Sequence, residues 1–238
     1  LSSLRRSPRP PPFAGYSMPS IPRGFDLAAA CEHLTRRDRA LAAWMRRIGE
    51  LQHDFRQRFD PTDALARAIL YQQLSGKAAS TIVGRVEVAL GSRRIDAAAL
   101  ARVDDATLRA CGVSFAKIAA LRDLAQKARE GVVPDARGLA RMPDADIIEH
   151  LTQVRGIGRW TVEMMLMFRL GRPDVLPVHD LGVRKGAQVL RKLAEPPKPL
   201  ALEEAGERWR PFRTLASFYL WRIADAAAQG APVKRSQD

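Results

Sequence analysis

The 238-residue chain is strongly basic, with 39 Lys and Arg against 26 Asp and Glu, a formal net charge of +13 and a pI near 10.7. This charge favours a polyanionic partner, first of all nucleic acid. No apolar run approaches the roughly 18 residues of a membrane-spanning helix, so a soluble protein without a membrane partner is expected. The hydrophobic content of 46% allows a sizeable core and excludes a purely disordered chain.

Cysteine and histidine usage argues against a transition-metal site. Only Cys31 and Cys111 occur, far apart and outside any C-x-x-C pattern. Neither a zinc knuckle nor a four-cysteine iron–sulfur cluster can be built from them. The histidines show no paired metal spacing, so chemistry without zinc, iron–sulfur or another cofactor is expected.

The two ends of the chain differ in composition from the middle. Residues 1–23 combine Arg5, Arg6 and Arg9 with a Pro10-Pro11-Pro12 run, which indicates a flexible basic arm; a targeting segment is the alternative. Residues 229–238 are expected to form a C-terminal tail. Between them, residues 24–228 are predicted to form an all-helical domain.

Helical periodicity runs almost throughout from Phe25, and alternating β-branched runs are missing. We therefore predict an all-α fold of two helical lobes around a cleft. One helix is expected after Asp38 and one after Thr62 as N-cap. Two more helices are expected. One runs from Ser75 to a stop at Gly91, and the other is capped by Ser114 and ended by Gly131.

Residues 144–170 predict two helices that meet at a glycine turn. Ile147, Ile148 and Leu151 mark the first helix, and Arg159 begins the second. In the turn, Gly156 and Gly158 lack a Cβ atom, so the backbone can adopt positive φ and approach a phosphate. The first amides of the second helix and the Thr161 hydroxyl would add donors. The alternative is a plain helix-turn-helix in which the glycines only permit the bend.

The wider pattern resembles a known family. The run Leu151-x-x-Val154-x-Gly156-Ile157-Gly158-x-Trp160-Thr161 resembles the helix-hairpin-helix DNA-binding motif. The segment 171–180, ending in His179-Asp180, resembles the Gly/Pro-rich loop and aspartate of the helix-hairpin-helix superfamily of DNA glycosylases. Within this superfamily, the sequence most resembles DNA-3-methyladenine glycosylase II, in its shorter form without an amino-terminal β domain. The stretches 68–79, 112–117 and 209–222 also match in the family's order.

This resemblance implies a monofunctional glycosylase of base excision repair that flips alkylated purines such as 3-methyladenine out of double-stranded DNA and hydrolyses their bond to the sugar. Asp180 would be the catalytic carboxylate, because bond cleavage builds positive charge on the sugar. Asp180 is also a plausible N-cap for a helix over 181–193. Asp174, in the same loop, is interpreted as a turn residue. Trp160 stands where strand-nicking relatives have a lysine, so no Schiff base is expected.

Further residues receive roles from the same resemblance. Trp160 and Trp221 would line the base pocket, although core packing is the alternative for both. Met164 stands where a family member has a tyrosine, which puts the substrate range in doubt. Glu163 and His179 are possible helpers of the reaction.

Contacts with DNA are expected on several segments. Gln73, or else Leu74, would fill the gap left by the flipped base. Phosphate contacts are expected from Lys77, Lys117 and Arg159. The backbone carbonyls of three hairpin residues would hold a structural Na⁺ or K⁺ ion: Thr152, Val154 and Ile157.

Two rival interpretations stay open. One is a helix-hairpin-helix DNA-binding module without catalysis, against which the intact Asp180 argues. The other is a glycosylase for deaminated or oxidised bases. A monomer in the bacterial cytoplasm, associated with the nucleoid, is expected.

Overall fold

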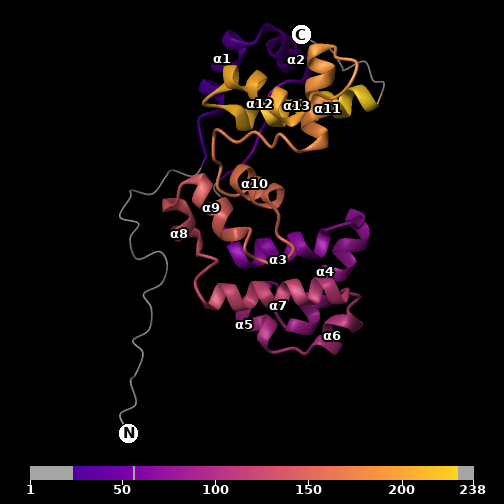
Figure 1. The fold of residues 1–238 in the computed structure, drawn as a ribbon. Helices are drawn as coiled ribbons and strands as arrows, with labels where there is room; N and C mark the ends of the chain where they lie inside the picture. The colour runs from indigo at the N-terminus through magenta and orange to yellow at the C-terminus, as the bar shows by residue number, and fades with distance from the viewer. Residues whose placement is uncertain (1–23, 56, 230–238) are drawn as a thin grey trace. The chain divides into compact units, whose positions relative to one another are not determined.

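The computed structural model describes residues 24–55 and 57–229, which fold into helices joined by loops, with no β-strand among them (Figure 1). The all-α prediction is confirmed. The predicted arm at 1–23 and nearly all of the predicted tail at 229–238 lie outside the described residues. The elements in chain order are α1 (Leu27–Arg37), α2 (Arg39–Ile48), α3 (Pro61–Tyr71), α4 (Gly76–Leu90), α5 (Ala97–Ala101), α6 (Asp105–Ala110), α7 (Phe115–Arg129), α8 (Ala136–Arg141), α9 (Asp144–Leu151), α10 (Arg159–Phe168), α11 (Leu181–Arg191), α12 (Pro199–Gly206), the 3-10 helix η1 (Glu207–Trp209) and α13 (Arg213–Ala228).

The chain forms two compact units that are interleaved in sequence. Among the described residues, the first unit comprises residues 58–162, with α3 to α9 and the start of α10. The second unit joins the chain up to Gln57 with the chain from Glu163 onward, and so contains α1, α2 and α11 to α13. Two helical lobes are thus confirmed, while the cleft between them stays a prediction. No described helix is long and apolar enough to span a membrane.

In the first unit, α7 packs against both α3 and α5. Ser75 caps α4 and Ser114 caps α7 through bonds from the backbone N–H three residues on, as predicted. The predicted cap at Thr62 is wrong. Asp60 caps α3 by accepting the Asp63 N–H at 3.1 Å, because Pro61 is well suited to the first helical position.

In the second unit, α11 and α13 pack closely. A Cβ atom at Gly186 of α11 would overlap the Leu220 carbonyl of α13, so the two backbones can approach only because residue 186 is glycine. Tyr219 and Trp209 fill the core beside them and are almost fully buried. The glycine therefore sets the spacing of the helices that carry the residues discussed below.

Asp38 is a buried junction of this unit. It caps α2 by accepting the Leu41 N–H at 3.1 Å, accepts the Trp209 indole N–H at 2.8 Å and is ion-paired with Arg191. Burial alone would raise the pKa of Asp38, but the bonds from Leu41, Trp209 and Arg191 together hold this pKa below its ordinary value. One carboxylate therefore joins α2, η1 and α11.

Asp38→Ala should lower the free energy of unfolding by about 2–4 kcal/mol, because it removes a helix cap and leaves the buried Trp209 N–H without its acceptor. Asp26→Ala is the matched control: Asp26 caps the neighbouring α1 from an exposed position, and its loss should be about 1 kcal/mol. Urea unfolding at neutral pH measures both. Equal losses in the two variants would contradict the role given to Asp38.

Candidate functional site

The hairpin of the first unit has the predicted geometry. Helix α9 ends at Leu151, α10 begins at Arg159, and the Ile157 N–H donates to the Val154 carbonyl at 3.0 Å within the turn. Val154 and Ile157 are buried, whereas Gly156 and Gly158 are exposed. Apolar side chains thus anchor the turn from inside and leave its glycine backbone on the surface.

The two glycines do different things, which corrects the expectation that both supply positive φ. Gly156 has φ of +79°, and a Cβ atom there would lie 3.4 Å from the Ala120 Cβ. Gly158 does not adopt positive φ, and a Cβ atom there would meet nothing within 4 Å. Gly156 is therefore needed for the turn itself. Nothing in the protein requires glycine at 158, which leaves close approach of a ligand as a reason for it.

The turn between α3 and α4 carries the predicted inserting residues. Gln73 is one of the described non-glycine residues with positive φ, at +57°, and its side chain is exposed. Leu74 is 40% exposed, high for a leucine. The Gln72 side-chain amide donates to the Gly156 carbonyl at 2.8 Å. The structure therefore brings this turn and the hairpin together in one unit.

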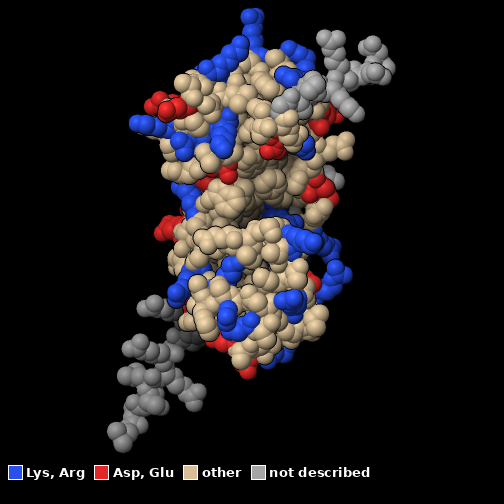
Figure 2. Space-filling model, turned by 90° about the vertical axis from the view of Figure 1, so that its right-hand side faces the viewer, with Lys and Arg blue, Asp and Glu red and all other residues tan. Residues whose placement is uncertain are grey.

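The predicted phosphate contacts divide into two groups. Lys77 and Arg159 are exposed, and Thr161 is half-buried in the first turn of α10. Lys117 instead donates to the carbonyls of Leu70 and Gln72, at 2.8 Å each, and burial lowers the pKa of its ammonium group. Two of its three N–H donors are therefore already used within the protein. Lys and Arg are also more frequent than acidic residues on the face in Figure 2.

Asp180 lies in the second unit and caps α11. Its Oδ1 atom accepts the Val183 N–H at 2.8 Å and the Trp221 indole N–H at 2.8 Å. The predicted helix is confirmed, although it ends at Arg191 rather than at 193. The capping interpretation of Asp180 is therefore correct, and it orients the half-buried carboxylate.

Asp174 is held very differently. Its carboxylate accepts two bonds from the Arg213 guanidinium, at 2.7 and 3.0 Å, and one from Arg210 at 2.7 Å. Asp174 lies in a bend, as expected of a turn residue, and it also ties the loop to α13. Its negative charge is compensated by the two arginines, unlike an anion placed to receive a reacting group.

Aromatic rings stack beside Trp221. Its ring centroid lies 5.8 Å from that of Phe168 and 6.1 Å from that of Phe218, within 25° of parallel. The His53 and Phe168 rings form a T-shaped pair with centroids 5.6 Å apart. The sequence analysis missed Phe168, Phe218 and His53. Phe168 follows Met164 by one helical turn and Phe218 precedes Trp221 by three residues, so the spacing was a usable signal for two of them.

Residues on α10 support a surface role for Trp160. Trp160 is 50% exposed, so the alternative that it packs in the core is wrong. Met164 is half-buried one turn later on the same helix face. Glu163 is only 3% exposed and is therefore not a solvated side chain, whereas His179 is exposed.

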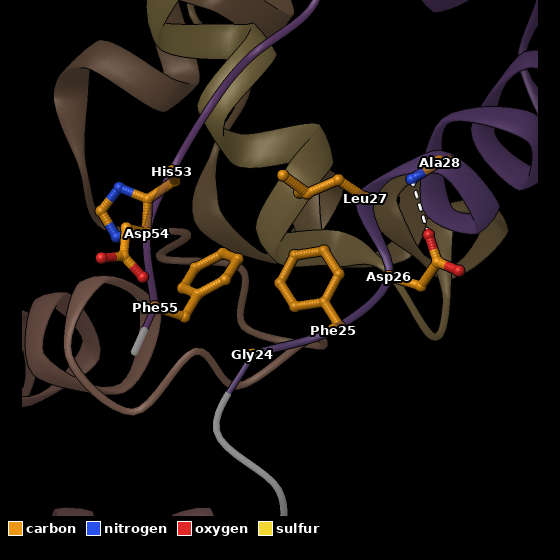
Figure 3. Close-up of a pocket in the computed structure, with 8 residues that line it drawn as sticks. All are labelled: Gly24, Phe25, Asp26, Leu27, Ala28, His53, Asp54 and Phe55. Carbon is orange, nitrogen blue, oxygen red and sulfur yellow. Dashed lines mark hydrogen bonds between the residues drawn. The ribbon is translucent and has the colours of Figure 1, made fainter. Parts of the chain in front are cut away.

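A separate pocket of about 560 Å³ lies in the second unit. Figure 3 shows the rings of Phe25 and Phe55 side by side on it, with His53 and Asp54 along one wall and Asp26 bonded to the Ala28 N–H. No residue predicted for the site lines this pocket, but His53 belongs both to its wall and to the aromatic group beside Trp221.

Among the described residues, no group of His, Cys, Asp and Glu side chains is arranged to hold a metal ion. Cys111 is buried and Cys31 half-buried, both as free thiols. The hairpin carbonyls are compatible with a cation site, because the Val154 carbonyl accepts one N–H and keeps a second lone pair.

Comparison with known proteins places the chain in a family. Residues 66–211 match the model of the HhH-GPD superfamily of base excision DNA repair proteins. DNA-3-methyladenine glycosylase 1 of Schizosaccharomyces pombe is 38% identical over 176 residues, which cover 74% of this chain and 77% of that protein. The chain therefore belongs to the HhH-GPD superfamily.

Solved structures agree with this assignment. The S. pombe 3-methyladenine DNA glycosylase in complex with abasic DNA has a TM-score of 0.74 at 32% identity, covering 87% of this chain and all of that one. A DNA-3-methyladenine glycosidase from Bacillus halodurans has a TM-score of 0.77 at 36% identity, covering 85% and 92%. The fold is that of the DNA glycosylases in the superfamily.

The hairpin glycines give a paired test. Gly158→Ala should leave the free energy of unfolding within about 0.5 kcal/mol of wild type, yet weaken binding to a DNA duplex about tenfold, because the methyl group blocks close approach. Gly156→Ala should lower the free energy of unfolding by about 1–2 kcal/mol, since alanine disfavours positive φ. Fluorescence anisotropy and urea unfolding measure the two effects. Unchanged affinity in Gly158→Ala would show that no DNA phosphate approaches this turn closely.

Proposed function

We propose that the chain is a monofunctional DNA glycosylase of base excision repair that removes alkylated purines such as 3-methyladenine and leaves an abasic site. The observation that carries this proposal is the Asp180 carboxylate, oriented by Val183 and Trp221 beside stacked aromatic rings. Family membership and the names of the relatives, DNA-3-methyladenine glycosylases, support the same activity.

Asp180 would act on the transition state rather than on the substrate. As the base departs, positive charge develops on the sugar, and a carboxylate nearby stabilises it. At about 4 Å and an effective dielectric near 20 the attraction is roughly 4 kcal/mol, or about a thousandfold in rate. Water then completes the hydrolysis. Because an alkylated purine is already cationic, it leaves without a proton from a second carboxylate.

Strand cleavage is not part of the proposed reaction. A glycosylase that also nicks the strand uses an amine to form a Schiff base, and the indole of Trp160 offers none. Trp160 and Trp221 would instead contact the extruded base, because an electron-poor ring is held by aromatic faces. Met164 stands where a family member has a tyrosine, so a base pocket that includes it would be less aromatic. This departure favours the second candidate, a different lesion range with deaminated or oxidised bases.

DNA would be held by the surfaces of the first unit. The backbone at Gly156 and Gly158, with Arg159 and Thr161, would bind phosphate, and the turn at Gln73 and Leu74 would enter the base stack. A Na⁺ or K⁺ ion on the carbonyls of three residues would tie the hairpin to the phosphate: Thr152, Val154 and Ile157. The protein would act as a monomer on the nucleoid of a bacterial cytoplasm.

Asp180→Asn should reduce base release from methylated duplex DNA by at least about a hundredfold without loss of DNA binding, because the amide keeps the cap but not the charge. Asp174→Asn, in the same loop, is the control and should retain release per folded molecule. Free methylated purines and alkali-dependent strand breaks are measured together. Breaks without alkali would contradict the monofunctional mechanism.

Release of deaminated or oxidised bases alone would support the second candidate. No release from any of these substrates, with DNA binding retained, would reject the enzyme and leave a DNA-binding module.

Gly182→Ala should lower the rate of base release about tenfold while the fold is kept. A Cβ atom at this position would lie 2.7 Å from the Trp221 ring and 3.1 Å from the Asp180 Oδ1, so the bond between these two side chains must shift. Gly84→Ala, on α4 with open space around the new methyl group, is the control and should be slightly stabilised, by about 0.5–1 kcal/mol. Single-turnover rates and thermal unfolding separate the two outcomes, and an unchanged rate in Gly182→Ala would argue against the Trp221–Asp180 bond.

A further inference from the structure

The turn between α3 and α4 holds an unfavourable backbone conformation at its tip. Gln73 has φ of +57°, in the left-handed region that side chains with a Cβ atom disfavour by about 1–2 kcal/mol. Such a residue persists only when its surroundings fix it. Gln73 and Leu74 are both exposed, so their own side chains do not supply that restraint.

The restraint comes from groups on either side of the tip. The Lys117 ammonium group donates to the Leu70 carbonyl and to the Gln72 carbonyl, at 2.8 Å each, where α3 ends. The Gln72 side chain is fixed in turn by its bond to the Gly156 carbonyl. The backbone entering Gln73 is therefore held by a cation on one side and by the hairpin on the other.

Helix α7 also fixes the hairpin. The Asp123 carboxylate accepts the Arg155 N–H at 2.7 Å and is paired with Lys127 at 2.6 Å. Burial would raise the pKa of Asp123, but the bonds from Arg155 and Lys127 hold it below its ordinary value. Helix α7 thus contacts both turns: Lys117 binds the turn between α3 and α4, and Asp123 binds the hairpin turn.

We propose that Lys117 is a positioning residue for base extrusion: its ammonium group holds the turn of Gln73 and Leu74 in the conformation that enters the DNA stack. The role rests on the proposed function, but it concerns extrusion and not bond cleavage. Extrusion from a paired duplex must be driven by the inserted side chain, whereas a lesion without a partner base is already partly unstacked. Loss of Lys117 should therefore matter for paired lesions and much less for unpaired ones.

Lys117→Met tests this with two DNA substrates that carry one alkylated purine, either paired or opposite an abasic-site analogue. Single-turnover base release should fall about tenfold or more on the paired lesion and less than about threefold on the unpaired one. Lys117→Arg should restore most of the difference, because a guanidinium group also donates to two carbonyls.

Arg122→Met is the matched control. Arg122 lies on the same helix and donates to the carbonyls of Leu100 in α5 and of Val103 just after it, which belong to neither surface turn. Any loss it causes should be equal on both substrates. An equal loss in Lys117→Met, or no loss on the paired lesion, would overturn the proposal and leave Lys117 a structural residue.

A second readout does not depend on catalysis. The emission of 2-aminopurine beside an abasic-site analogue changes when a side chain enters the stack, and it is measured at saturating protein. Wild type and Arg122→Met should produce the same change, and Lys117→Met a change at least about twofold smaller. If wild type released no base but gave this pattern, the proposed function would fail and the positioning role would stand. Equal changes in all three proteins would reject the role.

Discussion

The close approach of α11 and α13 is the constraint on which the second unit depends. Gly186 allows the backbones to meet at Leu220, and Gly182, one turn earlier, leaves room for the Trp221 ring beside Asp180. Because α11 starts at Asp180, the same packing sets both the core and the position of the carboxylate. A larger residue at Gly186 would clash with the backbone of α13 at Leu220, and one at Gly182 would clash with the Trp221 ring next to Asp180.

The carboxylates of the protein show how one residue type serves several purposes. Asp38 is buried and paired with Arg191, Asp174 is compensated by two arginines, and Asp180 accepts uncharged N–H donors from Val183 and Trp221. Val183 and Trp221 orient the Asp180 carboxylate, whereas arginine side chains tie Asp38 and Asp174 to other segments of the fold.

The first unit is organised around α7, a helix outside the hairpin. Helix α7 packs on α3 and α5, and its polar side chains extend to the turns on either side of it. A rigid helix whose own side chains bind backbone carbonyls and amides is a suitable support for surface turns, since loops alone would be mobile. Lys117 illustrates the consequence, because its ammonium group binds the carbonyls of Leu70 and Gln72 and so fixes the turn that follows α3.

The amino-acid sequence determined the features that depend on local spacing. The all-helical fold, the helices that follow Ser75 and Ser114, the hairpin at 144–170 and the cap at Asp180 follow from periodicity and from residues adjacent in the chain, whereas the catalytic role of Asp180 is implied by the family resemblance. Local competition explains the one wrong cap, where Asp60-Pro61 prevails over Thr62.

Only the tertiary structure decided which distant residues meet. The bond from Trp221 to Asp180, the stack of Phe168 with Phe218 and the bonds from Lys117 to the end of α3 each join segments far apart in sequence. Spacing along a helix fixes the face on which a side chain lies, but its partner across the core is set by the packing of whole helices.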